Sequence, residues 1–223
     1  MQVNVCKFEV SNLLHQLRQL KNTHQSRNHV TCDVWCDLQS GGFTVFQRRM
    51  DGSEHFYRSW ADYVGGFGKH HREHWLGLEK IHCLTASKGR AELYVDMYDC
   101  DGVRKYARYS YFHVEGSSVN YKLHISGYSG TAGDSFNRGS GSHNLNGMQF
   151  STWDRDNDRW SGASCAAYGG GLGGWWFSTC FYCNLNGPYV CGLVQRSEIG
   201  VLWQNLGSSS RSLKYTEIKM RFI

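Results

Sequence analysis

Nine cysteines constrain this 223-residue chain more than any other feature of its sequence. They are Cys6, Cys32, Cys36, Cys83, Cys100, Cys165, Cys180, Cys183 and Cys191. Cytosolic domains rarely carry so many cysteines unless these bind metal, whereas secreted domains use them as disulfide bridges. We therefore expect a secreted, extracellular protein. Because the number is odd, at least one thiol is free or is paired with another chain.

The rest of the composition indicates an ordered, loop-rich fold. The chain has 26 Gly and 1 Pro, and aromatic residues make up 14% of it. Disordered chains are poor in aromatic residues, and helical bundles are rich in Ala, Leu, Glu and Lys, so neither class fits. The formal net charge of +5 is spread along the chain, which argues against a nucleic-acid binder.

The sequence shows neither a membrane span nor a leader. No apolar run reaches the roughly 18 residues that a membrane span needs, so we expect no membrane insertion. No signal peptide is visible at the first residues. We therefore expect the sequence to be a piece of a longer secreted protein.

Hydrophobic periodicity separates an N-terminal segment from one large domain. In residues 8–21, apolar residues recur at the spacing of one helix face. This pattern predicts a helix that either lies on the domain or ends a coiled coil continuing upstream. Residues 22–28 are polar and indicate a linker. We assign residues 1–31 to a helical stub and linker, and residues 32–223 to the main domain.

Alternating patterns predict strands in the main domain and a long loop region near its end. Strand character occurs at residues 34–36, 42–48, 90–97, 106–114, 121–126 and 213–223. In residues 90–97, Leu93, Val95 and Met97 share one face of the expected strand. A short helix is expected over residues 60–64. Residues 127 to about 192 are rich in Gly, Ser, Asn, Asp and aromatics, which favours an ordered, functional loop region.

An acidic segment carries the strongest chemical motif. Asp154, Asp156 and Asp158 alternate along the chain, and such carboxylates can converge on one calcium ion, which takes oxygen ligands. The segment is not an EF-hand, because Arg159 and Cys165 stand where that motif needs glycine and glutamate. An acidic, solvated turn is the alternative interpretation.

Two further motifs match enzyme sites by sequence alone. Residues 70–74 fit the zinc-peptidase pattern H-x-x-E-H, which works only on a helix. Glycines on both sides leave little room for a helix, so we interpret these histidines as exposed at a junction between loop and strand. Residues 169–174 fit G-x-G-x-x-G, but Trp175 and Trp176 follow where a dinucleotide site needs a helix. We expect no catalytic activity.

Four blocks of sequence resemble the fibrinogen C-terminal domain family. Residues 41–53 (GGFTVFQRRMDGS) are similar to the family block GGWTVFQRR.DGS, and residues 63–84, 133–154 and 165–187 are similar to later blocks. Order and spacing agree from about residue 32 to residue 223, in a pattern nearest to ficolins, tachylectins and invertebrate fibrinogen-related lectins. The resemblance implies an α+β fold with a central twisted antiparallel sheet, short helices and a long loop-rich C-terminal region that binds calcium and ligand.

The resemblance also implies a calcium site. Its ligands would be the side chains of Asp156 and Asp158 and the backbone oxygens of Trp160 and Gly162, with Asp154 orienting the loop or a water. One residue is inserted after Gly162 relative to the family pattern, so the carbonyl positions follow less directly than the carboxylates. The ion would hold the loop in one shape and would not activate water.

Four disulfide pairs are expected from the same resemblance and from the positions of the cysteines in the sequence. They are Cys6–Cys36, Cys165–Cys180, Cys83–Cys100 and Cys183–Cys191. The first two match bridges of the family, with Cys32 as a competitor of Cys6, and the other two would be particular to this chain. Cys32 then remains for linking chains, although the sequence allows many other pairings.

The ligand pocket is expected beside the Cys165–Cys180 bridge, where acetyl-binding relatives use a funnel of aromatic rings. The rings that would line it here are Tyr168, Trp176, Phe181, Tyr182 and Tyr189. Three residues stand where those relatives have a histidine and two tyrosines, namely Phe181, Ser197 and Ser209. The pocket has therefore lost polar groups and at least one ring.

Together these patterns predict a calcium-binding pattern-recognition lectin of innate immunity, binding acetylated or other microbial glycans as an oligomer. The alternative is a protein-binding module that recognises a receptor or a peptide ligand, and the lost pocket groups favour this alternative.

Overall fold

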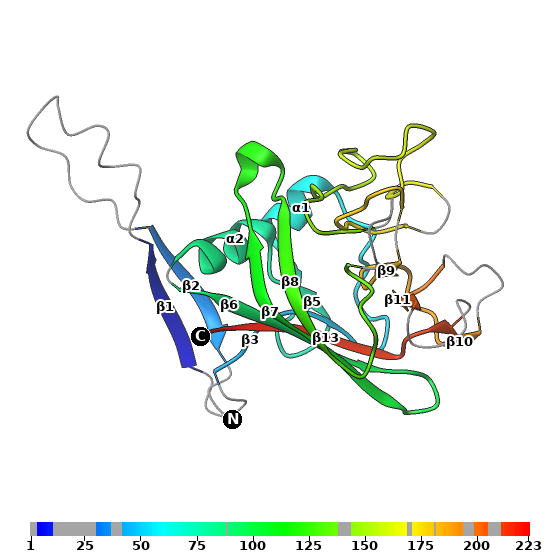
Figure 1. The fold of residues 1–223 in the computed structure, drawn as a ribbon, viewed down its shortest axis with the longest axis horizontal. Coiled ribbons are helices and arrows are strands. Elements are labelled where there is room, and N and C mark those ends of the chain that lie inside the picture. Colours follow the sequence, from blue (N-terminus) through cyan, green and yellow to red (C-terminus); the bar gives the residue numbers. More distant parts are fainter. Residues whose placement is uncertain are drawn as a thin grey trace, which may run out of the picture.

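The structure, a computed structural model, describes residues 4–10, 30–36, 42–87, 89–137, 144–168, 171–180, 182–193, 199–204 and 211–223. Of residues 4–10 and 30–36 it describes the backbone alone. Figure 1 shows a twisted sheet at the centre, two helices packed beside it and a loop-rich part at one end. This arrangement confirms the α+β fold expected from the sequence.

A seven-stranded antiparallel sheet, in the order β4-β5-β3-β13-β6-β7-β8, forms the centre of the fold. Its strands are β3 (Thr44–Arg49), β4 (Phe67–Gly68), β5 (His74–Trp75), β6 (Ala91–Tyr98), β7 (Arg104–Val114), β8 (Leu123–Gly130) and β13 (Tyr215–Phe222). The last strand of the chain, β13, lies between β3 and β6. The end of the chain therefore completes the middle of the sheet.

Shorter elements surround this sheet. They are the helices α1 (Trp60–Gly65) and α2 (Leu78–Ser87), the 3₁₀ turn η2 (Ser117–Val119), and the strand pairs β1 (Asn4–Val10) with β2 (Val30–Cys36), β9 (Cys183–Asn184) with β11 (Leu202–Trp203), and β10 (Gly192–Leu193) with β12 (Arg211–Ser212). The helix predicted over residues 60–64 corresponds to α1, whose N-cap Ser59 forms a capping box with Asp62. Helix α2, which packs on β7, had no counterpart in the pattern analysis.

The N-terminal helix prediction is wrong where the structure describes it. Residues 8–10 belong to β1, which pairs with β2 from Asn4↔Cys36 to Val10↔Val30. The remainder of the predicted helix, residues 11–21, lies outside the described residues. The boundary placed between residues 31 and 32 falls inside β2. Cys6, Phe8 and Val10 also fit a period of two, and strand pairing selects that period over the helical one.

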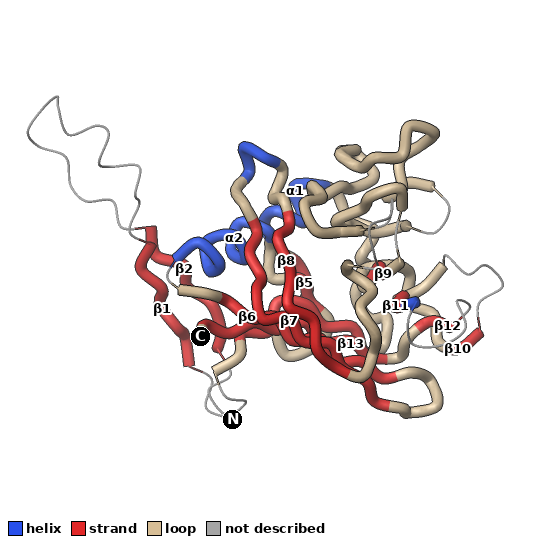
Figure 2. The backbone as a smooth tube through the Cα atoms, in the orientation of Figure 1, coloured by secondary structure: helices blue, strands red, loops and turns tan. Residues whose placement is uncertain are grey.

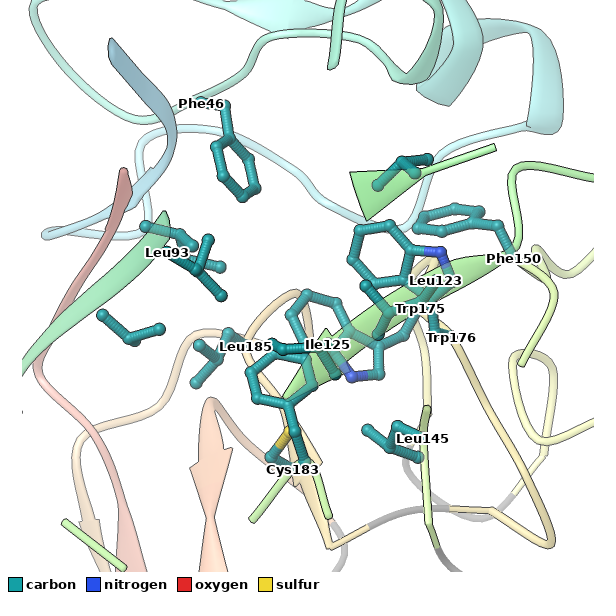
Figure 3. Packing of buried hydrophobic residues seen from close by; sticks show 14 of the residues in the cluster. Phe46, Leu93, Leu123, Ile125, Leu145, Phe150, Trp175, Trp176, Cys183 and Leu185 are labelled. Atoms are coloured by element: carbon teal, nitrogen blue, oxygen red, sulfur yellow. The ribbon is translucent and has the colours of Figure 1, made fainter. Parts of the chain in front are cut away.

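Alternation along β6 defines the two faces of the sheet, as the sequence predicts. Leu93, Val95 and Met97 are all buried on the inner face. The inner face packs against α2 and against a cluster of aromatic rings from the C-terminal loops. Figure 3 shows part of this cluster, with Trp175, Trp176 and Phe150 close together. Large rings bury much apolar surface, so they hold these loops on the sheet although the loops have few strands of their own.

A buried polar network joins β3 to the C-terminal loops. The Gln47 side-chain amide donates to the Leu185 carbonyl at 2.8 Å, and Arg49 Nη1 donates to the Gly187 carbonyl at 2.7 Å. The Asn186 side chain in turn donates to the Gly174 carbonyl at 2.9 Å. Loop carbonyls that lack strand partners are therefore satisfied by side chains, two of them from β3 and one from the loop itself.

The H-x-x-E-H segment forms a turn and β5, with Glu73 as a structural anion. Glu73 is 1% exposed, and its carboxylate accepts hydrogen bonds from four backbone N–H groups of residues 50–54 at 2.7–3.2 Å. Arg49 Nε lies 3.6 Å from Glu73 Oε1. The carboxylate thus fixes the turn after β3 and compensates a buried guanidinium.

We expect Glu73→Gln to lower the free energy of unfolding by about 3–5 kcal/mol, because the change leaves Arg49 as an uncompensated buried charge. Urea unfolding would measure the loss. Glu54→Gln is the matched control, because Glu54 pairs with the part-exposed Arg58 and its loss should cost at most about 1 kcal/mol. Equal losses for the two variants would contradict the structural role of Glu73.

His74, on β5, should make stability fall in mild acid. Burial lowers its pKa from the ordinary 6.5, and nearby Arg48 and His70 lower it further, whereas the carbonyls of Arg72 and Val45 oppose the shift. The unfolded state therefore binds the proton more tightly, and the stability contributed by neutral His74 is full above pH 6.5 and is lost as pH falls toward the lower folded pKa.

Thermal unfolding at pH 7.5 and at pH 5.5 would test this expectation. His74→Gln should show a smaller drop in melting temperature between the two values than the unmodified chain. The control His55→Gln, at an exposed position that does not affect the pKa of His74, should behave as the unmodified chain does. An undiminished drop in the His74 variant would show that another group is responsible.

Candidate functional site

The predicted site lies in the loop-rich part of the molecule that follows β8 (Figure 2). The structure joins Cys165 and Cys180 in a disulfide with their Cα atoms 5.1 Å apart, which is the pair predicted from the family resemblance. Cys165 is fully buried, and Cys180 adopts a left-handed backbone with φ of 62°. The bridge therefore fixes the end of the acidic segment to the following loop.

Asp154 anchors the acidic segment to α1. Its Oδ1 accepts hydrogen bonds from the backbone N–H of Trp60 at 2.9 Å and from the Thr152 hydroxyl at 2.7 Å. Arg155 extends over the Trp60 ring, with its guanidinium carbon 4.2 Å from the ring centroid. Asp154 thus has the loop-orienting contacts that the resemblance implied for it.

Asp158 organises the rest of the acidic segment. One carboxylate oxygen accepts from Trp160 N–H and the other from Cys165 N–H, both at 2.7 Å. Asp156 Oδ1 accepts from Asp158 N–H at 3.1 Å. The pKa of Asp158 is raised to about 6, because burial and the charge of Asp156 outweigh the opposite effect of the two N–H bonds.

The residues of this segment fit the calcium ion that the resemblance implies. Asp156 and the half-buried Asp158 place two like charges side by side, a donor pair that a hard cation stabilises. Within the described part of the chain, no three His, Cys, Asp or Glu side chains gather as a metal site. Further ligands would have to be backbone oxygens, and Trp160 and Gly162 lie in the same loop. The ion would supply fixed positive charge that holds this loop.

The structure corrects two of the predicted disulfides. Cys100, in the turn after β6, pairs with Cys191, and their Cα atoms are 5.8 Å apart although 91 positions separate them in sequence. The predicted pairs Cys83–Cys100 and Cys183–Cys191 are therefore wrong. Cys83 is disulfide-bonded to a cysteine outside the described side chains. The fold brings the loop of Cys191 to the turn of Cys100, and no local pattern signals that contact.

Among the described cysteines, Cys183 carries a free thiol, whereas the sequence predicts that Cys183 pairs with Cys191 and that Cys32 is left to link chains. Cys183 lies in the core beside Leu185 and Ile125 (Figure 3), and burial raises the pKa of its thiol. The side chains of Cys32 and of the predicted pair Cys6–Cys36 lie outside the description, so that pair stays a prediction.

The rings predicted to line one funnel do not gather in one place. Trp176 is 1% exposed and donates its indole N–H to the Tyr121 carbonyl at 2.8 Å, so it belongs to the core and cannot line an open pocket. Tyr189 donates its hydroxyl to the carbonyls of Met50 at 2.8 Å and Lys214 at 2.9 Å. It lines a separate hollow of about 290 Å³ beside Arg49.

Of the other three predicted rings, the structure describes Tyr168 and Tyr182. Tyr168 is 65% exposed and contacts the Trp160 ring, with centroids 6.2 Å apart. Tyr182 is half-buried next to β11, where its carbonyl accepts from Gln204 N–H at 3.0 Å. Phe181, Ser197 and Ser209 lie outside the described residues. Among the described residues, the expected aromatic site is therefore represented by Tyr168 and its contact with Trp160.

The sequence analysis missed a second exposed aromatic pair. Tyr57 and Trp153 are 48% and 47% exposed, and their ring centroids lie 6.2 Å apart. Trp153 directly precedes Asp154, so this pair lies at the start of residues 153–168, the loop that contains the three acidic residues. Tyr168 lies at the end of the same loop. Nothing in the local sequence distinguishes these rings from the buried ones, because exposure depends on the packing of the whole loop.

Residues 11–223 match the family described as fibrinogen beta and gamma chains, C-terminal globular domain. The chain belongs to this family, and its fold is that of a fibrinogen-like globe. Among the described helices, none has the length and apolar character that a membrane crossing requires.

Curated relatives agree with this assignment. Fibroleukin of Bos taurus is 43% identical over 183 residues, which cover 81% of this chain and 40% of that protein. Fibrinogen C domain-containing protein 1 of Homo sapiens is 44% identical over 195 residues, which cover 84% and 40%. The chain thus spans about two fifths of the length of these relatives. They show the family without specifically showing the predicted likeness to ficolins.

Solved structures have the same fold. The fibrinogen-like globe domain of human ANGPTL2 gives a TM-score of 0.78 at 38% identity, covering 94% of this chain and 97% of that one. The lamprey fibrin D-dimer, complexed with the peptide ligand Gly-His-Arg-Pro-amide, gives 0.76 at 33% identity, covering 89% and 66%.

Proposed function

We propose that this chain is an extracellular protein-binding module that recognises a receptor or a peptide ligand through residues 153–168 and Tyr57. One observation carries the proposal: large aromatic rings are exposed along this segment, whereas the rings expected to form a sugar funnel are dispersed. The two disulfides among described cysteines suit an oxidising, extracellular setting.

Exposed Tyr and Trp rings favour a protein partner. Trp153, Tyr57 and Tyr168 are each about half exposed or more, while the other Phe, Tyr and Trp rings that the structure describes, except Tyr111, are buried or half-buried. Tyr and Trp are enriched at protein interfaces, where they bury large areas and keep a polar group for hydrogen bonding. Asp154 and the Cys165–Cys180 bridge hold both ends of the segment, so little ordering is needed when a partner binds.

The comparisons support a peptide or protein ligand. The lamprey fibrin structure, which shares this fold at 33% identity, holds a short peptide ligand. That property is known of lamprey fibrin, and we extend it to this chain as a proposal. In the full-length protein, several copies of the module would raise the overall affinity for a surface that displays many ligands.

A second candidate function is recognition of acetylated microbial glycans in innate immunity. The observation that favours it is Tyr168, which rests on Trp160 beside the Cys165–Cys180 bridge, where the family resemblance placed an acetyl pocket. Stacking of a sugar face on one ring is weaker than enclosure in a funnel. Glycan recognition is therefore the weaker of the two candidate functions.

We also propose that calcium is bound by Asp156 and Asp158 with the backbone oxygens of Trp160 and Gly162. Its effect would be to rigidify the binding segment rather than to contact the ligand.

The peptide Gly-His-Arg-Pro-amide, labelled with fluorescein, is the probe for the binding function. We expect fluorescence polarisation to detect its binding, and Tyr168→Ala to weaken it by about tenfold, the effect typical of a well-placed interface ring. Tyr111→Ala is the matched control, because Tyr111 is also exposed but lies on β7. Displacement of the peptide by N-acetylglucosamine would favour the glycan function. A Tyr168 variant that binds as the unmodified chain does would contradict both functions at this segment.

Thermal unfolding with and without calcium tests the metal proposal separately. Calcium at a hundredfold excess over its dissociation constant should stabilise the chain by about 2.7 kcal/mol, and Asp158→Asn should abolish the shift. Asp99→Asn is the control, because Asp99 also accepts from two backbone N–H groups, those of Asp101 and Val103, in an acidic turn. An unmodified chain that does not respond to calcium would refute the assignment.

A further inference from the structure

The outer face of the central sheet carries a row of cations. On β13, Lys219 and Arg221 face outward, and on β7, Arg104 and Arg108 do so. The register places Lys219 opposite Tyr94 of β6, and Tyr94 opposite Arg108. The cations therefore extend across three neighbouring strands, over about 10 Å from β13 to β7 at the usual strand spacing.

These cations surround a hollow of about 290 Å³ on the sheet surface. Its charged lining consists of four cations, the ones just named, and one carboxylate, Glu92, so the lining has a charge of 4 − 1 = +3. Asp96, the partner of Arg104, and Glu217, the partner of Lys219, reduce this excess to 4 − 3 = +1, and Arg48, the second cation bound to Glu217, brings it to +2. An excess remains because Glu92 and Glu217 each bind two cations.

The carboxylates lie beneath the guanidinium groups rather than above them. Glu92 has a side chain 1% exposed and is held by Arg108 and Arg221, whose side chains are 46% and 38% exposed. Asp96 is 12% exposed, against 55% for Arg104. A molecule that approaches this face therefore meets positive charge, while the compensating negative charge is on the protein side.

Several guanidinium N–H groups are not bonded to these carboxylates. Arg104 and Arg108 each bind their carboxylate through Nε and Nη2, and Arg221 binds through Nε. Among the residues that the structure describes, the remaining terminal nitrogens of these three arginines have no hydrogen-bond partner. The face thus offers donors that are already positioned for an external anion.

Aromatic rings fix the two cations of β13. Arg221 lies 4.7 Å above the Phe43 ring centroid, and Lys219 lies 5.6 Å from Phe43 and 5.3 Å from Tyr94. Cation–π contacts of this kind hold long side chains in place and lower the cost of ordering them on binding. They also bring positive charge next to the rings that line the hollow.

We propose that this outer face of the sheet is a second binding site, and that its ligand is a sulfated polysaccharide. An extended polyanion matches cations spaced over three strands better than one small anion does. Sulfate oxygens accept several guanidinium N–H groups at once, and they carry the negative charge that this face lacks. This site lies on the sheet, away from residues 153–168, so it is independent of the proposed protein-binding function.

Immobilised dextran sulfate, with unsulfated dextran beside it, tests the proposal in a biosensor at 50 and 300 mM NaCl. The unmodified chain should bind the sulfated polymer alone, and more weakly at the higher salt concentration because salt screens exposed charges. Arg104→Gln combined with Arg221→Gln should weaken binding by about tenfold or more, because it removes charge-assisted hydrogen bonds.

The control is Arg58→Gln combined with Lys122→Gln, which removes the same charge from part-exposed cations elsewhere. It should bind as the unmodified chain does. If the first double variant does not fold, Arg104→Gln alone is compared with Arg58→Gln, since Arg104 is the most exposed of the four lining cations. The proposal would be overturned if the control variants lost as much binding as the Arg104 and Arg221 variants, or if the chain bound unsulfated dextran. Displacement by poly-glutamate as effective as displacement by dextran sulfate would assign the face to acidic proteins instead.

Discussion

The buried guanidinium of Arg49 is the interaction on which the remaining structure depends. A charge removed from water must be compensated, and here the Glu73 carboxylate and the Gly187 carbonyl both do so. One side chain of β3 therefore fixes the turn after its own strand and the C-terminal loop that crosses the sheet. The loops contain few strands, so their position relative to the sheet is set by such side-chain contacts and by packed rings.

Aromatic residues have two separate roles in this chain. Rings such as Trp175 and Trp176 are fully buried and supply the apolar contact between loops and sheet. Tyr57, Trp153 and Tyr168 remain at the surface around the acidic segment. The same residue types thus build the core and the proposed contact surface. Because Trp176 is part of the core and three other rings are exposed, a protein interface fits this surface better than a sugar funnel does.

The proposed binding surfaces use different physical principles. Residues 153–168 form a loop whose shape is held at both ends, by Asp154 on α1 and by the Cys165–Cys180 bridge. The outer face of the sheet needs no such devices, because neighbouring strands already fix the spacing of Lys219, Tyr94 and Arg108. A loop can be reshaped by an ion, whereas a sheet presents its charges at intervals set by backbone hydrogen bonds.

The sequence by itself determined the family, the faces of β6 and the acidic segment, because these depend on short periodic or contiguous patterns. It also pointed to the Cys165–Cys180 pair through a family block. Only the tertiary structure decided that Cys100 meets Cys191, that Cys183 stays a buried thiol and that Trp176 is part of the core. The physical reason is that a disulfide needs two Cα atoms within about 6 Å, and a ring is buried only when distant segments cover it. Both conditions depend on the path of the whole chain, which no local pattern contains.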